Sequence, residues 1–191
     1  MNNTIGKLPF ILVSPTEGIS PALAENISEG VGDFFGYPVK VSPLLQNIDF
    51  AFNSDRNQYN STIILAKLAD LAPERCLKIL AITDKDLFIP ILTHVYGEAQ
   101  LNGIACIVSI NRLNTDLQLS KKKVFDRIIK ESIHELGHTF NLRHCKDHSC
   151  IMHYCRSLDD VDLKSNQYCR YCEVLLSDSI TELSVSPSPV P

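Results

Sequence analysis

The chain has 191 residues, a formal net charge of −4 and one basic run at Lys121, Lys122 and Lys123, a balance that argues against nucleic acid as a partner. No apolar run approaches the roughly 18 residues of a membrane span, and the run at 8–13 is too short for a signal peptide, so no membrane partner is expected. We expect a cytoplasmic monomer whose seven cysteines stay reduced, as metal ligands or core residues.

The first part of the chain alternates an apolar run with an amphipathic segment. Residues 8–13 predict a buried strand. Ser20 followed by Pro21 predicts the start of a helix, and Gly36 is placed to end it. A second strand is predicted over residues 37–45.

A polar stretch at 47–60 leads into the next predicted helix. This helix carries Tyr59, Ile63, Leu68 and Leu71 on its apolar stripe and ends before Pro73, because proline cannot continue a helix.

Two further strands are predicted over residues 77–83 and 103–109. Pro90 cannot donate a hydrogen bond to a sheet, so the apolar segment 88–92 is expected at a sheet edge or outside the sheet. The alternation predicts an α/β (α+β) fold, a mixed twisted sheet with packed helices and one antiparallel edge strand. The Ser- and Pro-rich residues 184–191 predict a disordered tail.

A long amphipathic helix is predicted over residues 122–142. Its apolar residues fall within about half of its circumference, and His134 and His138 fall on the opposite half. Histidines four residues apart lie on one helix face and can share a Zn²⁺ ion, and Glu135 is placed to act on a metal-bound water. The alternative is a pair of solvated histidines, which Glu135 and a third histidine downstream disfavour.

The third predicted ligand, His144, requires a sharp turn after the helix. A continuing helix would carry residue 144 about 9 Å beyond His138, too far to share one ion. Asn141 is the best non-glycine residue for a left-handed helix end, so we expect it to return His144 to the metal. His148 and His153 are the alternative third ligands.

Three neutral histidines would leave zinc a fourth position for water, whose pKa falls towards 7. Glu135 would take the proton as general base and pass it to the leaving amine. Peptide-bond hydrolysis is the reaction that such a site performs most naturally. The substrate would pair with an edge strand, for which residues 94–99 are the candidate, with Val95, Tyr96 and Gly97 as substrate-binding residues.

Cys145, Cys150, Cys169 and Cys172 form a C-x4-C … C-x2-C pattern. Two closely spaced cysteine pairs, separated in this way along the chain of a protein whose thiols stay reduced, predict a closed, structural Cys₄ zinc site. Such a site contributes folding energy to a segment too small for its own core. Cys155 is the alternative to Cys150.

The combined pattern resembles the metzincin clan of zinc peptidases, and in particular the archaemetzincins (archaelysins). The resemblance covers residues 134–172 and departs from the clan at Asn141, where glycine is usual. It implies a zincin-like fold with a Met-turn at Met152 beneath the zinc. It also implies that Tyr154 approaches the zinc or the oxyanion, with an ordinary core or surface tyrosine as the alternative. The cysteine pattern favours Cys150 over Cys155.

The prediction is a zinc metallopeptidase with one catalytic and one structural zinc ion, acting on peptide or protein substrates. We expect a single catalytic domain over 1–183, formed by a sheet-and-helix part (1–141) and a small zinc-stabilised subdomain (142–183). The small size and the resemblance favour an aminopeptidase, although exopeptidase and endopeptidase both stay open. The alternatives are a catalytically silent zinc-stabilised module that binds peptide or protein, which Glu135 disfavours, and a metallohydrolase acting on a small amide.

Overall fold

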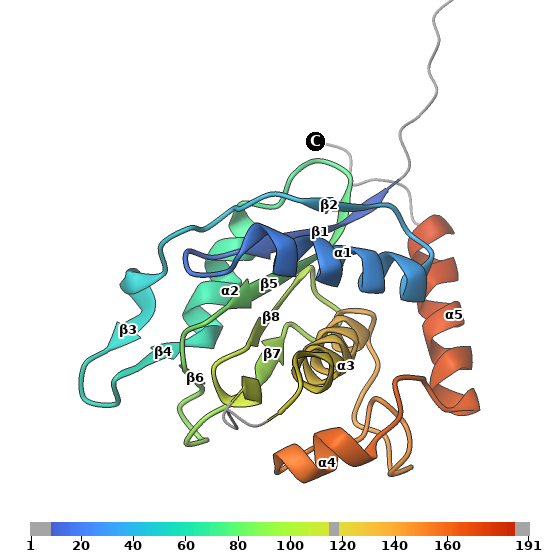
Figure 1. Ribbon diagram of the computed structural model, residues 1–191. Helices are drawn as coiled ribbons and strands as arrows, with labels where there is room; N and C mark the ends of the chain where they lie inside the picture. Colours follow the sequence, from blue (N-terminus) through green and yellow to red (C-terminus); the bar gives the residue numbers. More distant parts are fainter. Residues whose placement is uncertain (1–8, 115–118, 186–191) are drawn as a thin grey trace, which may run out of the picture.

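The computed structural model describes residues 9–114 and 119–185 and contains a five-stranded sheet with helices on both faces (Figure 1). In spatial order its strands are β2 (Val39–Val41), β1 (Phe10–Pro15), β5 (Cys76–Thr83), β8 (Ala105–Ser109) and β7 (Gly97–Ala99). The first four pair in parallel, and β7 pairs antiparallel with β8 at the edge. This confirms the predicted mixed fold with one antiparallel edge strand.

A second, three-stranded sheet lies beside the first and was not predicted. Its strands are β3 (Phe52–Asn53), β4 (Gln58–Asn60) and β6 (Leu87–Phe88), preceded by a 3₁₀ turn, η1 (Asp49–Ala51). Strands of two or three residues are too short to show an alternating pattern, so residues 47–60 appeared only as a polar connection. An isolated bridge between Leu87 and Val95 joins this sheet to the segment that enters β7.

Two of the helices begin and end as their local sequences predict. Helix α1 (Pro21–Phe35) starts at Ser20, whose side chain accepts the Leu23 N–H, and ends at Gly36 with a φ of 70°. Helix α2 (Ser61–Asp70) ends before Pro73. Ser20 accepts a free backbone N–H at the start of α1, and Pro73 has no N–H to donate to a continuing α2. These helix boundaries could therefore be predicted from the local sequence.

The predicted stripe of α2 and the predicted second strand are partly wrong. Tyr59 lies in β4, before the helix, and Leu71 follows its last residue and is exposed. Ile63 is 48% exposed, whereas Ile64 and Leu65 are buried beside Leu68. Three consecutive apolar residues leave the phase of a helix stripe undefined, and packing on the sheet selects the later two. The strand predicted over 37–45 is limited to β2, because only its middle pairs with β1.

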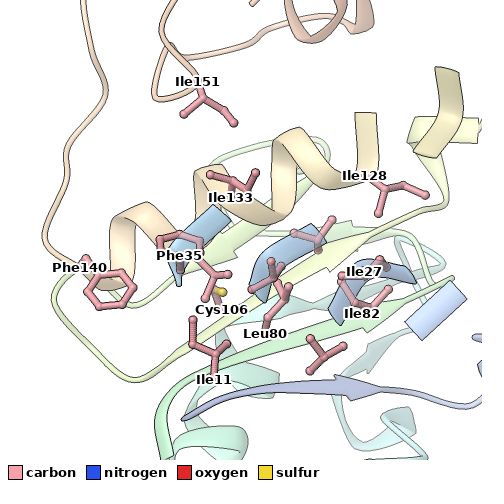
Figure 2. Close-up of a cluster of buried hydrophobic side chains, with 14 of the residues drawn as sticks. Ile11, Ile27, Phe35, Leu80, Ile82, Cys106, Ile128, Ile133, Phe140 and Ile151 are labelled. Carbon is pink, nitrogen blue, oxygen red and sulfur yellow. The ribbon is translucent and has the colours of Figure 1, made fainter. Parts of the chain in front are cut away.

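Helix α3 (Lys121–Thr139) lies on the same face of the sheet as α1, while α2 covers the opposite face (Figure 1). Figure 2 shows Ile133 of α3 on the side of the helix towards Ile151, and Phe140, just after the helix, near Phe35. The helix itself contacts β5 and β8. The helix is therefore anchored along its length on the parallel sheet, which gives the residues on its other side a rigid base.

A 3₁₀ turn, η2 (Arg112–Asn114), precedes α3. The C-terminal segment that follows α3 contains helices α4 (Leu158–Leu163) and α5 (Arg170–Val185). Ser157 caps α4 with a capping box. Helix α5 reaches two residues into the predicted tail, and residues 186–191 of that tail lie outside the described part of the chain. Among the residues that the structure describes, no helix is long and apolar enough to cross a membrane.

Candidate active site and metal centres

The C-terminal end of α3 brings three histidines together. His134 and His138 lie one turn apart on the helix, and the chain reverses at Asn141, whose φ of 68° confirms the predicted left-handed turn. His144 then returns towards the helix. The ring nitrogens that the three side chains offer lie within 4.8 Å of one another.

Backbone carbonyls orient two of these rings. His134 Nδ1 lies 2.8 Å from the Ile151 carbonyl oxygen, and His138 Nδ1 lies 2.7 Å from that of Leu142. A carbonyl oxygen only accepts, so each Nδ1 carries the proton and each Nε2 keeps its lone pair. The two Nε2 atoms face each other at 3.1 Å, where bare lone pairs repel unless a cation lies between them.

The donor set fits zinc. Nitrogen ligands about 2.0 Å from a tetrahedral zinc lie about 3.3 Å from one another, close to the separation of the two Nε2 atoms. Burial lowers the pKa of His134 well below its usual range and that of His138 to about 4. Both rings are therefore neutral at neutral pH, the form that binds a metal.

Glu135 lies between α3 and the edge strand β7. A Cβ placed on Gly97 would lie 2.6 Å from Glu135 Cγ and 2.8 Å from the Ile107 carbonyl oxygen, so this close approach requires glycine at position 97. Burial raises the pKa of the Glu135 carboxyl well above its usual range, the Glu131 charge adds to the rise, and Lys164 opposes it. A raised pKa makes the ionised carboxylate a stronger base than an ordinary one.

The histidines and Glu135 border a cavity of about 700 Å³. The opposite wall includes Val95, Tyr96 and Gly97, the residues predicted to bind substrate. Tyr154 also lines the cavity, 43% exposed, with its ring centroid 5.0 Å from that of His144. The remaining lining residues are Ile89, Leu92, Thr93, His94, Glu98, Ala99, Leu101, Glu131, Arg143, Cys155 and Arg156.

The edge of β7 is open over a short length only. Tyr96 and Gln100 use their backbone groups to pair with β8, because Ser109 donates to Tyr96 and Gln100 donates to Ala105. Backbone groups alternate in direction along a strand, so those of Gly97 and Ala99 point away from β8. The Val95 N–H already donates to Leu87 at 3.0 Å. Of the three residues predicted to pair with substrate, Gly97 is the one whose backbone groups face the open edge.

Met152 packs against Gly137 of α3. It is fully buried, and a Cβ on Gly137 would lie 2.6 Å from its sulfur. The carbonyl that orients His134 belongs to Ile151, directly before Met152, and the Met152 carbonyl accepts the Cys145 N–H at 2.9 Å. The turn at Met152 therefore supports His134 on one side and Cys145 on the other.

Four cysteine sulfurs form a second cluster. The Sγ atoms of Cys145, Cys150, Cys169 and Cys172 lie within 4.8 Å of one another, and those of Cys145 and Cys169 are 3.7 Å apart. A disulfide would need about 2.05 Å, whereas thiolates around a tetrahedral zinc lie about 3.8 Å apart. The alternative residue, Cys155, points towards Lys164 and the His153 carbonyl instead.

The alternative histidines and one further ion pair complete the neighbourhood. The rings of His148 and His153 contact each other at a tilt of 49° with centroids 4.3 Å apart, and His153 Nδ1 donates to the Cys145 carbonyl at 3.0 Å. Sequence reasoning missed the buried ion pair between Glu131 and Lys164. The spacing of Glu131, one helix turn before Glu135, was a usable signal, whereas the position of Lys164 was not.

Comparison with known proteins gives a consistent result. The model of peptidase family M54 matches residues 40–178. The archaemetzincin of Methanocaldococcus jannaschii is 32% identical, covering 92% of this chain and 97% of its own, and that of Methanopyrus kandleri is 34% identical, covering 92% and 93%. The crystal structure of the Methanopyrus kandleri archaemetzincin superposes with a TM-score of 0.81 at 32% identity, over 94% of this chain and 99% of that one. A zinc-dependent peptidase from Methanocorpusculum labreanum gives 0.79 at 30% identity, over 87% and 99%.

Proposed function

This chain belongs to peptidase family M54, the archaemetzincins, and is a zinc metallopeptidase; within that family we propose that His134, His138 and His144 hold its catalytic zinc and that Glu135 is its general base. The observation that carries the proposal is the pair of bare Nε2 atoms facing each other at 3.1 Å beside a buried carboxyl. This arrangement is costly without a cation and is well suited to one.

A zinc ion there would supply the Lewis acidity that activates water and polarises the scissile carbonyl. Glu135 takes the proton from the attacking water on a carboxylate oxygen and gives it to the leaving amine nitrogen. Its raised pKa makes it a stronger base for the first of these steps. The Tyr154 hydroxyl, on the His144 side of the cavity, donates to the oxygen that gains charge during the attack.

Main-chain pairing orients the peptide. Its backbone bonds to the groups of Gly97 and Ala99 that face away from β8, extending the sheet by one strand. Because β6 occupies the edge at Val95, only a short stretch of substrate pairs in this way. That limit supports cleavage near a chain end.

We further propose aminopeptidase activity, with Glu98 as the anion that binds the substrate α-ammonium. Glu98 lines the cavity, and its carboxylate accepts a hydrogen bond from Thr62 at 2.8 Å and another from Ser61. These contacts hold the carboxylate at the N-terminus of α2, where negative charge is favoured. A peptide with a free N-terminus is then cleaved about 100-fold faster than its acetylated counterpart.

The Cys₄ cluster holds a second, structural zinc and organises residues 142–183 as a small subdomain of a single catalytic domain. This centre is closed, since four thiolates fill a tetrahedral zinc. It requires reduced thiols, which supports a reducing compartment such as the cytoplasm.

The test is peptide-library cleavage, read by mass spectrometry, for the wild type and Glu135→Gln at equal zinc content. We expect cleavage by the wild type and a loss of at least 10²-fold in the variant. Cleavage that is unchanged in Glu135→Gln overturns the proposed role of the glutamate. A zinc-loaded wild type that binds peptides and cleaves none would instead identify a binding module.

A further inference from the structure

We propose that Lys164 cancels the charge of Glu131 at the inner wall of the active-site cavity, so that the wall accepts an uncharged substrate side chain. The inference rests on the proposed peptidase function and concerns which residue the enzyme prefers beside the scissile bond. It assigns a specificity role to a pair of side chains that the proposed chemistry uses neither as metal ligands nor as proton carriers.

The two members of the pair are placed differently with respect to the cavity. Glu131 lies one helix turn before Glu135 on α3 and lines the cavity with Tyr96 and Cys155. Lys164 follows α4 and reaches Glu131 from the protein interior, with its Nζ 2.7 Å from Glu131 Oε1. The Lys164 side chain is fully buried, so the carboxylate is the member of the pair that borders the cavity.

A network of contacts between α3 and α4 holds Lys164 in place. Arg127 makes two hydrogen bonds of 2.7 Å to the Asp162 carboxylate. Lys130 donates to the carbonyls of Val161 and Asp162, both at 3.3 Å. These bonds fix the chain on the N-terminal side of Lys164 against α3, so the ammonium cannot move away from Glu131 when substrate enters.

The charge of this wall determines which side chains it can accept. A lone carboxylate in a sheltered pocket selects lysine or arginine, as the acidic pocket of trypsin does. With an ammonium 2.7 Å away, the wall carries almost no net charge. A cationic side chain gains little attraction, because Lys164 cancels most of the field of Glu131, and an anionic side chain is repelled by the nearer carboxylate of Glu131. The same cavity is lined by Val95, Ala99 and Leu101, which suits an uncharged, apolar side chain.

The experiment uses the zinc-loaded full chain and peptides that differ only at the residue beside the scissile bond, which is leucine, lysine or glutamate. We expect the wild type to prefer leucine over both charged residues by at least about tenfold in kcat/KM. Lys164→Met removes the cancelling charge and raises the lysine-to-leucine ratio about tenfold. Glu131→Gln leaves the ammonium alone and raises the glutamate-to-leucine ratio instead. A merely structural pair would not raise the lysine-to-leucine ratio in one variant and the glutamate-to-leucine ratio in the other.

Two controls separate the charge effect from damage to the fold. The double variant Glu131→Gln/Lys164→Met removes both charges, leaves no unpaired buried ion, and restores the wild-type ratios. Lys123→Met removes a lysine that binds Asp162 at the surface, at 2.8 Å, and leaves both ratios unchanged. If Lys164→Met does not fold, the Glu131→Gln and double variants decide the question.

Each outcome bears on a different claim. A wild type that cleaves lysine peptides as fast as leucine peptides overturns the inference, as do unchanged ratios in both single variants. In either case the peptidase function stands, because peptides are cleaved. A zinc-loaded wild type that cleaves no peptide overturns the proposed function, and the specificity inference with it.

Discussion

Replacing Gly97 by alanine tests whether Glu135 must approach the edge strand closely. The new Cβ would lie 2.6 Å from Glu135 Cγ and 2.8 Å from both Glu135 Oε1 and the Ile107 carbonyl oxygen. Ordinary contacts between carbon atoms are about 3.5–4.0 Å, so one partner must shift by about 1 Å. The Ile107 carbonyl belongs to the paired strand β8, whereas the Glu135 side chain can rotate. The glutamate therefore moves, and β7 must also shift slightly to relieve the contact with the Ile107 carbonyl oxygen.

The size of the effect follows from that displacement. A general base moved by about 1 Å loses about 10²-fold in rate, and the tighter packing costs about 1–3 kcal/mol of stability. We expect Gly97→Ala to lower kcat/KM about 100-fold while the zinc content stays at the wild-type value. The assay is steady-state peptide hydrolysis with metal analysis and thermal unfolding of the same samples.

A matched control is available in α1. A Cβ on Gly32 meets Val39 Cγ2 at 3.4 Å, an ordinary contact, and alanine is favoured over glycine inside a helix by about 1 kcal/mol. Gly32→Ala should keep full activity and unfold at the same or a higher temperature. Wild-type kcat/KM in Gly97→Ala, with zinc bound, would refute the close approach of Glu135 to β7.

Three further predictions concern the turn, the tyrosine and the α3–α4 contacts. Asn141→Gly should keep the zinc affinity and the stability of the wild type. Asn141→Val should lower the free energy of unfolding by about 1–2 kcal/mol and weaken zinc binding, because a β-branched residue resists the left-handed conformation. Urea unfolding and zinc titration of the two variants measure these effects. Tyr154→Phe should lower kcat about 10²-fold at constant zinc content, and an unchanged kcat would exclude the oxyanion role. Arg127 holds the pKa of Asp162 at about 2, below its value of about 3.9 in the unfolded chain. The ionised carboxylate therefore stabilises the fold above pH ~4, and this contribution is lost as the pH falls towards 2. The free energy of unfolding of Asp162→Asn should therefore be about 2 kcal/mol lower than that of the wild type at pH 7. Denaturant unfolding should show this difference narrowing between pH 4 and pH 2.

Features with a local cause were accessible from the sequence. The strands β1, β5 and β8 are buried on both faces, so they appear as continuous apolar runs. Asn141 could be placed in the left-handed region because its short polar side chain tolerates that conformation. The histidine and cysteine spacings are likewise short-range patterns, since metal ligands must converge on one point.

Features that depend on distant pairing were not accessible. Lys164 meets Glu131 across 33 residues, and only the packing of α4 on α3 brings them together. The bridge between Val95 and Leu87 joins two sheets, so the short open edge at Gly97 could not be inferred from the strand pattern. In both cases the residues are ordinary in type, and their roles come from the tertiary contact.

The central claim is that the stretch from His134 to Cys145 joins a catalytic zinc site to a structural one. Zinc content per folded chain, measured for the wild type and for His134→Ala/His138→Ala, tests it most directly. We predict two zinc ions in the wild type and one in the double variant, which should remain folded and lose peptide hydrolysis. One zinc ion in the wild type, or two in the double variant, would contradict the account.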